Sequence, residues 1–148
     1  MSVKIAKSQN SVINSAVDEI RATLGDTNPA LVLFFASSTY EPGEISKAMK
    51  KVFSSSTVIG CSTAGEIISG HMLTNSVVAM ALDADTISSV HAGIIPLESP
   101  ANADTTLKSL SGAVGSTPIA LDPAKYVGLI LFDGLSGAEE STMERIGD

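Results

Sequence analysis

The apolar positions along the chain follow two patterns, and each pattern predicts one kind of element. Apolar residues three and four positions apart indicate amphipathic helices, and this spacing covers Ser11–Leu24, about Glu44–Phe53 and Ala103–Val114. Solid apolar runs are typical of strands buried on both faces, and such runs cover Leu31–Ala36, Thr57–Cys61 and Tyr126–Phe132. A further helix is expected from Gly137 to Ile146, because its acidic first turn suits a helix N-terminus.

The order of these elements predicts the fold class. A strand, a helix and a strand with short links, from Leu31 to Cys61, form a βαβ unit whose strands are parallel with a right-handed crossover. Two further apolar runs, Ser76–Leu82 and Thr86–Ile95, are separated by a short polar turn, which predicts an antiparallel hairpin. The stretch Ile67–Leu73 is compatible with a helix, a strand or an irregular segment. We therefore expect an α/β fold, with a mixed sheet, a parallel βαβ core, an antiparallel hairpin and flanking helices.

Length and composition predict one domain over residues 1–148. The chain is 44% hydrophobic and 17% charged, which is typical of a globular protein with a sizeable core. Its last predicted helix is followed by no further strand. We therefore expect a C-terminally truncated domain of a longer protein.

Charge disfavours several partners. Nine basic residues stand against sixteen acidic ones, for a net charge of −7, whereas nucleic acids and anionic membranes attract basic surfaces.

The single cysteine cannot form an intrachain disulfide, the N-terminus lacks the apolar segment of a signal peptide, and no apolar run reaches the roughly 18 to 20 residues that span a bilayer. We expect a cytoplasmic protein that binds neither nucleic acid nor membrane.

Polar turns follow the three apolar strands, and they form the candidate site. In open α/β sheets, ligands bind beyond the carboxyl ends of the strands. If the three strands are parallel, their turns meet at one edge and present hydroxyls, amides and carboxylates, a combination that suits a small zwitterion such as an amino acid. The expected ligand-binding residues are Cys61, Ser62, Thr63, Gly65, Glu66, Asp133, Gly134, Ser136 and Glu139. The alternative is that these residues only cap helices and form turns, as such residues commonly do.

Enzyme motifs are incomplete. The segment Gly60–Ala64 is similar to a nucleophile elbow but lacks the second glycine, and only His71 and His91 could serve as a base. No P-loop or zinc-ligand spacing is present, and the carboxylates of Glu66, Asp133 and Glu139 form no specific metal pattern. We expect no enzyme, no catalytic residue, no cofactor and no metal; an enzyme that uses Cys61 stays an alternative.

Two segments carry a resemblance to a known family. Gly60–Ile67 and Phe132–Glu140 together resemble the FIST family, specifically its N-terminal (FIST N) domain. The resemblance implies a small-molecule-binding sensory domain of prokaryotic signal transduction, with an amino acid or a similar metabolite as ligand. It also implies a signalling output domain as partner, in the same protein or in a complex, and the open sheet edge would permit a homo-oligomer. The alternative is a protein-interaction or scaffolding domain without a ligand.

Overall fold

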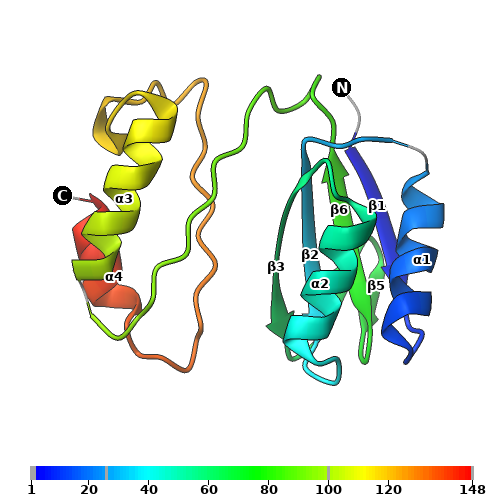
Figure 1. Cartoon of the computed structure of the whole chain (residues 1–148). Helices are drawn as coiled ribbons and strands as arrows, with labels where there is room; N and C mark the ends of the chain where they lie inside the picture. Colours follow the sequence, from blue (N-terminus) through cyan, green and yellow to red (C-terminus); the bar gives the residue numbers. More distant parts are fainter. Residues whose placement is uncertain (1–2, 26, 100, 148) are drawn as a thin grey trace. The chain divides into compact units, whose positions relative to one another are not determined.

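The computed structural model describes residues 3–25, 27–99 and 101–147 (Figure 1). The chain divides into two compact units, residues 1–90 and residues 91–148. We refer to them as the first unit and the second unit.

Within the described residues, the first unit is built on a four-stranded sheet with the order β1-β6-β2-β3. The elements of this layer and its helices are β1 (Val3–Ser8), α1 (Ile13–Leu24), β2 (Leu31–Ser37), α2 (Pro42–Val52), β3 (Thr57–Thr63) and β6 (Val77–Leu82). Strands β2 and β3 are parallel and α2 connects them, which confirms the predicted βαβ unit. Strand β6 runs antiparallel to both of its neighbours.

Helices α1 and α2 pack against one face of this sheet and form a single core with it. Alternate residues of the strands point to that face, because successive side chains of a strand point to opposite sides. Position 34 of β2 pairs with position 79 of β6, which in turn pairs with position 6 of β1. All three belong to the core cluster, together with residues of both helices: Ala6, Ala16, Val17, Ile20, Leu24, Val32, Phe34, Ala36, Tyr40, Ile45, Met49, Phe53, Val77, Ala79 and Ala81.

A short hairpin follows β3. It consists of β4 (Glu66–Ile68) and β5 (His71–Leu73), which pair antiparallel as a separate two-stranded sheet. Gly70 lies in its turn with a φ of 77°, a left-handed conformation that favours glycine. The mixed sheet, the antiparallel hairpin and the flanking helices together confirm the predicted α/β fold class.

The position of the predicted hairpin was wrong. We expected Thr86–Ile95 to pair with Ser76–Leu82, but no strand is assigned to the former segment. Strand β6 has no free edge to offer, because β1 occupies one side and β2 the other. The hairpin of the structure lies earlier in the chain, in the stretch Ile67–Leu73, whose sequence is compatible with a helix, a strand or an irregular segment.

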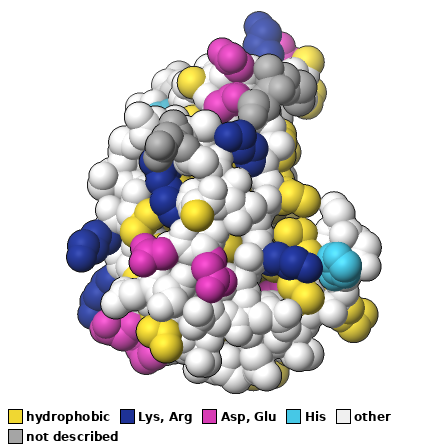
Figure 2. Space-filling model, turned by 90° about the vertical axis from the view of Figure 1, so that its right-hand side faces the viewer, with side chains coloured by type: hydrophobic (Ala, Val, Ile, Leu, Met, Phe, Trp, Pro, Cys, Tyr) yellow, Lys and Arg dark blue, Asp and Glu magenta, His cyan; other side chains and the backbone are white. Residues whose placement is uncertain are grey.

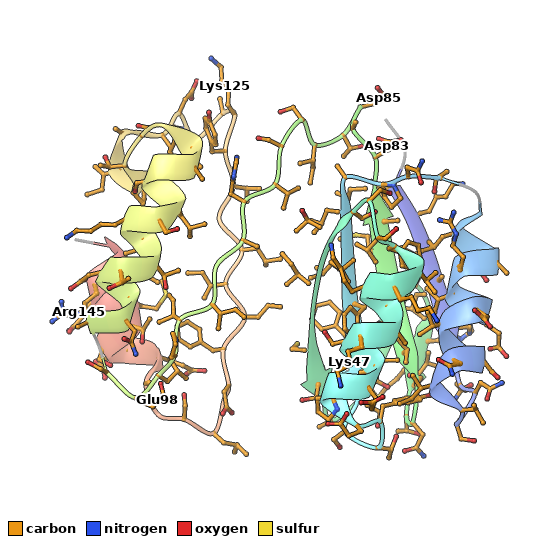
Figure 3. The ribbon with its side chains drawn as sticks, viewed as in Figure 1. Lys47, Asp83, Asp85, Glu98, Lys125 and Arg145 are labelled. Carbon is orange, nitrogen blue, oxygen red and sulfur yellow. The ribbon has the colours of Figure 1, made fainter. Side chains whose placement is uncertain are left out.

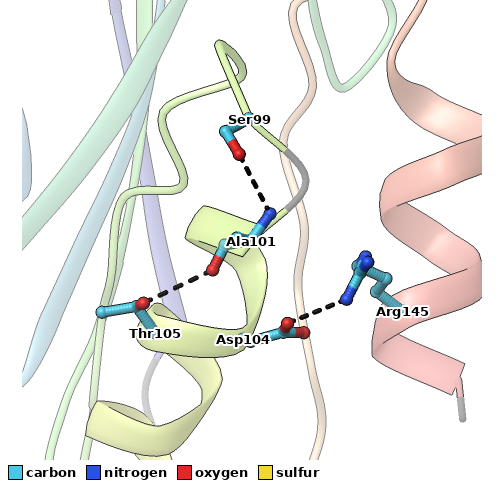
Figure 4. A network of polar contacts seen from close by, with 5 residues as sticks. All are labelled: Ser99, Ala101, Asp104, Thr105 and Arg145. Carbon is cyan, nitrogen blue, oxygen red and sulfur yellow. Dashed lines mark hydrogen bonds and ion pairs between the residues drawn. The ribbon is translucent and has the colours of Figure 1, made fainter.

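The second unit contains α3 (Ala101–Val114), a short 3₁₀ helix η1 (Pro118–Ala120) and α4 (Glu139–Gly147). Arg145 of α4 donates to Asp104 of α3 at 2.8 Å, which joins the two helices (Figure 4). At the start of α3 the Ser99 hydroxyl accepts from the amide of Ala101 at 3.4 Å. The two helices predicted in this part of the chain are thereby confirmed.

The strand predicted for Tyr126–Phe132 was also wrong, since no strand is assigned there. Its apolar side chains are largely solvent-exposed, with Val127 at 91% and Leu129 at 62%. An apolar run supplies the side chains of a buried strand but not the hydrogen-bonded neighbour that a strand requires. The expectation of three parallel strands is therefore reduced to two, β2 and β3.

Surface charge and hydropathy add two observations. Basic and acidic side chains are interspersed on the face that Figure 2 shows, without an extended surface of one sign. Among the residues that the structure describes, no helix combines the length and the apolar character needed to cross a membrane.

Candidate functional site

A hollow of about 190 Å³ lies in the first unit at the carboxyl ends of the parallel strands β2 and β3. The N-terminal half of α2 forms its other wall. Such a position beyond the carboxyl ends of parallel strands is where open α/β sheets bind ligands. The hollow is lined by Phe34, Ala36, Ser37, Tyr40, Pro42, Ile45, Ser46, Gly60, Cys61 and Ser62.

Gly60 creates the space beside Phe34. A Cβ atom at position 60 would lie 2.4 Å from Cε1 of the Phe34 ring, far inside the contact distance of two carbon atoms. Gly60 is also directly opposite Phe34 in the parallel ladder. Because position 60 of β3 carries no side chain, the Phe34 ring can lie against β3, and the hollow stays open above the ring.

The floor of the hollow is apolar and its rim is polar. Phe34, Ala36 and Ile45 are 4%, 2% and 2% exposed, whereas Ser46 and Ser62 are exposed at the rim. The side-chain hydroxyls of Ser46 and Ser62 have no hydrogen-bond partner among the described residues. An apolar surface with a few polar groups able to orient a guest is the usual form of a small-molecule site.

Two buried hydroxyls stabilise the walls of the hollow. Tyr40 is 4% exposed, and its hydroxyl donates to the carbonyl of Asn10 at 2.8 Å. Burial raises the pKa of Tyr40, and the carboxylates of Glu66 and Glu19 raise it further. The tyrosine therefore stays a protonated donor that joins the loop after β2 to the segment before α1. The second buried hydroxyl, that of Ser37, accepts from the amide of Thr39 at 3.3 Å.

Glu66 is turned inward rather than toward the hollow. It is 1% exposed, and Oε1 of its carboxylate accepts from the Thr63 hydroxyl at 2.5 Å. Its Oε2 accepts from the Ser76 amide at 3.2 Å and from the Ser76 hydroxyl at 2.5 Å. Glu66 thus connects the end of β3 to the residue that precedes β6, and both carboxylate oxygens are occupied by the protein itself.

Cys61 lies in β3 beside the hollow and is partly buried. Burial raises the pKa of its thiol above the ordinary value. Because the thiolate is the nucleophilic form of cysteine, a raised pKa lowers the reactive fraction near neutral pH. This environment supplies no activation of the thiol of the kind that a catalytic cysteine needs.

We expect Cys61 to react with iodoacetamide at neutral pH more slowly than the thiol of N-acetylcysteine. The chain has one cysteine, so the mass of the intact protein reports this reaction directly. Since the pKa is raised, the rate should rise to that of an ionised thiol only at a higher pH than for N-acetylcysteine. A rate at pH 7 equal to or above that of N-acetylcysteine would contradict this account.

The predicted site residues around Asp133 belong to the second unit. The Asp133 side chain accepts from the amide of Leu135 at 3.0 Å, and the Ser136 hydroxyl donates to the Asp133 carbonyl at 2.7 Å. Gly134 and Glu139 are exposed, and Glu139 begins α4. These are local turn contacts next to a helix start. The approach of this turn to Cys61–Glu66 stays a prediction, because the two segments belong to different units.

Of the residues predicted around Cys61, the structure brings Cys61 and Ser62 to the hollow. Thr63 binds Glu66, and Gly65 lies exposed in the turn between them. The sequence did not point to Tyr40, Ile45 or Ser46. A signal for the last two was available, since they follow the polar loop after β2 and start the crossover helix of the predicted βαβ unit.

Two other site types find little support in the described residues. No group of three or more histidine, cysteine or carboxylate side chains could hold a metal ion there. A hollow of about 20 Å³ between the starts of α3 and α4 has room for about one water molecule. The hollow in the first unit is the larger candidate.

Comparison with protein families now identifies the class of protein. The family model described as FIST N domain matches residues 30–148. The chain therefore belongs to the FIST N domain family, a family of sensory domains in signal transduction. The match includes β2, α2 and β3, which form the hollow, and extends through the second unit.

Comparisons with individual proteins add little. No curated protein matches the chain. Among solved structures, a mutant FtsZ from M. jannaschii is similar over 53% of this chain, with 19% identity and a TM-score of 0.36. The chain spans 25% of the length of that FtsZ chain, and a likeness of this extent carries no argument about function.

Proposed function

We propose that this FIST N domain is the sensory input part of a cytoplasmic signalling protein and that it binds a small molecule in the hollow between β2, β3 and α2. The observation that carries the proposal is the hollow itself. It combines an apolar floor with free hydroxyls at the rim, at the edge of the sheet where α/β proteins bind ligands. The family membership supports a sensory role.

The proposal assigns no catalysis to the domain. The burial that raises the pKa of Cys61 supports this assignment, and so do the described lining residues, none of which carries a charged side chain. Acid–base chemistry at this position would need a titratable group near neutral pH. A signalling output domain, in the same protein or in a complex, would receive the change that ligand binding causes.

A thermal-shift screen of the protein against amino acids and other small metabolites tests the proposal. A ligand at one hundred times its Kd stabilises the folded state by about 2.7 kcal/mol, which corresponds to a rise in Tm of several degrees for a chain of this size. We expect at least one compound to raise the Tm of the natural protein and not that of a Ser46→Phe variant, whose new ring would enter the hollow. If no compound in the screen raises the Tm, the proposal is wrong.

A second candidate is a protein-interaction domain that needs no ligand. One observation favours it: Ile67 and Met72 are directly opposite each other in the hairpin β4–β5 and are 74% and 83% exposed. An exposed apolar pair on a two-stranded arm is a plausible contact for a partner protein. Light scattering of the natural protein and of an Ile67→Ser, Met72→Ser variant would separate the candidates, since a dimer lost only in the variant would favour an interaction role.

A further inference from the structure

We propose that the ligand of the hollow is a small uncharged molecule with one apolar part and one hydrogen-bonding group, rather than an amino acid or another ion. This inference rests on the proposed function, because it names the ligand class of the same site. Three features of the first unit carry it: the described lining has no charged side chain, acidic side chains already occupy the N-terminus of α2, and the volume suits a single ring.

Among the residues that the structure describes, no side chain that lines the hollow is charged. The ten lining residues are apolar, hydroxyl-bearing, glycine or a thiol, and the raised pKa of Cys61 keeps that thiol neutral near pH 7. A charge moved from water into such surroundings loses hydration that no partner replaces. A zwitterion would bring two such charges, so the lining selects against the amino acid that the sequence suggested.

An anion would also find the N-terminus of α2 occupied. Helix N-termini attract anions through free amides and the helix dipole. At α2, however, the carboxylate of Glu41 already accepts from the amide of Glu44 at 2.5 Å. The Glu44 side chain adds a second negative charge in the first turn, and its partner Lys47 binds it at 2.9 Å. A ligand carboxylate would compete with two acidic side chains of the protein.

A cation would find no counter-charge that is not already bound. At the start of α2, the Glu41 carboxylate accepts from the Glu44 amide and the Glu44 carboxylate pairs with Lys47. The carboxylate nearest in sequence to the β3 end of the hollow is that of Glu66, and its oxygens are bound to Thr63 and Ser76. Asp83 and Asp85 follow the carboxyl end of β6 (Figure 3). Since β6 is antiparallel to β2, these two aspartates lie at the opposite end of the sheet from the hollow.

The volume limits the size of the ligand. At about 190 Å³, the hollow slightly exceeds the engineered apolar cavities of about 150 Å³ that bind benzene in other proteins. One ring with a short polar substituent fills this space. Its ring would lie on Phe34, Ala36 and Ile45, and its hydrogen-bonding group would reach the rim at Ser46 or Ser62.

The test compares four probes that share one ring: 2-phenylethanol, phenylacetate, 2-phenylethylamine and phenylalanine. Each is titrated into the ¹⁵N-labelled full chain while the amide signals of Ser46, Gly60 and Ser62 are followed by NMR. We expect 2-phenylethanol to shift these signals saturably, and we expect the anion, the cation and the zwitterion to bind at least tenfold more weakly.

The outcomes separate the two proposals. If a charged probe shifts the same amides as tightly as 2-phenylethanol, the uncharged class is wrong while the hollow remains a ligand site. If none of the four probes shifts these amides and no compound raises the Tm, the hollow is not a ligand site, and both proposals are wrong.

A matched pair of variants locates the binding. Ser46→Phe places a ring at the rim, and we expect it to abolish the effect of 2-phenylethanol at Gly60 and Ser62. Ser54→Phe places the same ring on an exposed residue after α2 that does not line the hollow, and we expect the effect to be unchanged. Equal binding by both variants would overturn the placement of the ligand.

Discussion

Replacement of Glu66 by alanine is expected to destabilise the protein by about 2 to 4 kcal/mol. In the variant the Thr63 hydroxyl can still donate to the Ala36 carbonyl at 3.3 Å, but the change leaves the Ser76 amide and hydroxyl without their acceptor. Each buried polar group left unpaired costs about 1 to 3 kcal/mol. It also removes a side chain that is 1% exposed. Urea unfolding of the full chain, followed by circular dichroism, measures the loss as a lower midpoint at constant slope.

Two further variants test the cause of this loss. Glu66→Gln keeps the shape of the side chain but turns one acceptor into a donor that faces hydroxyl and amide donors, so we expect an intermediate loss. Glu44→Ala removes an equally charged residue whose side chain is 60% exposed and pairs with Lys47 on the surface. Such pairs contribute at most about 1 kcal/mol. A Glu66→Ala protein as stable as Glu44→Ala would contradict the internal role of Glu66.

Gly60→Ala is expected to destabilise the protein by about 1 to 3 kcal/mol, the usual cost of overpacking. The sign of the stability change is informative, because replacing a glycine inside a strand by alanine would otherwise stabilise the protein by about 0.5 to 1 kcal/mol. Here the new Cβ would lie 2.4 Å from the Phe34 ring, so the ring must move. We also expect weaker binding of 2-phenylethanol, because the hollow above the ring becomes smaller.

Phe34→Leu supplies the matching partner for a double-mutant cycle with Gly60→Ala. If the clash with the ring is the cause, Gly60→Ala should cost clearly less when leucine occupies position 34. Gly65→Ala is the control within the first unit, since its Cβ would make only an ordinary contact at 3.5 Å with the Leu73 carbonyl. A neutral or stabilising Gly60→Ala in the natural protein would contradict the described packing.

Much of the first unit could be predicted because its signals are local. The helical spacing of α1 and the apolar runs of β2 and β3 each identify their element, and the short links of a βαβ unit fix the parallel pairing. Strand β1 gave no such signal. Its buried positions Ala6 and Ser8 are small, and its Lys4 ammonium donates to the Leu24 carbonyl at the end of α1 at 2.8 Å.

The errors came from pairing, which is not local. The run Thr86–Ile95 has the composition of a strand, but β1 already occupies the edge of β6 that it would need. The run Tyr126–Phe132 is more apolar still, yet it is exposed and unpaired in the described structure. Composition indicates which residues can form a strand, and only the whole sheet decides which edges are free.

Ligand binding at the predicted site residues stays a prediction, and the structure only describes the hollow near the first group of them. The carboxyl ends of β2 and β3 were the expected place, and Cys61 and Ser62 line the hollow found there. The carboxylate of Glu66 was expected to face a ligand, but its side chain binds Thr63 and Ser76 instead. The direction of a single side chain depends on partners ten residues away in the sequence, which spacing does not reveal.

A crystal structure of the full chain soaked with 2-phenylethanol tests the central claim most directly. The account predicts electron density for one ring between Phe34, Ile45 and Gly60, with the hydroxyl within hydrogen-bond distance of Ser46 or Ser62. A hollow that contains only solvent at a saturating concentration of the probe, or one that is closed by side chains of the protein, would contradict it.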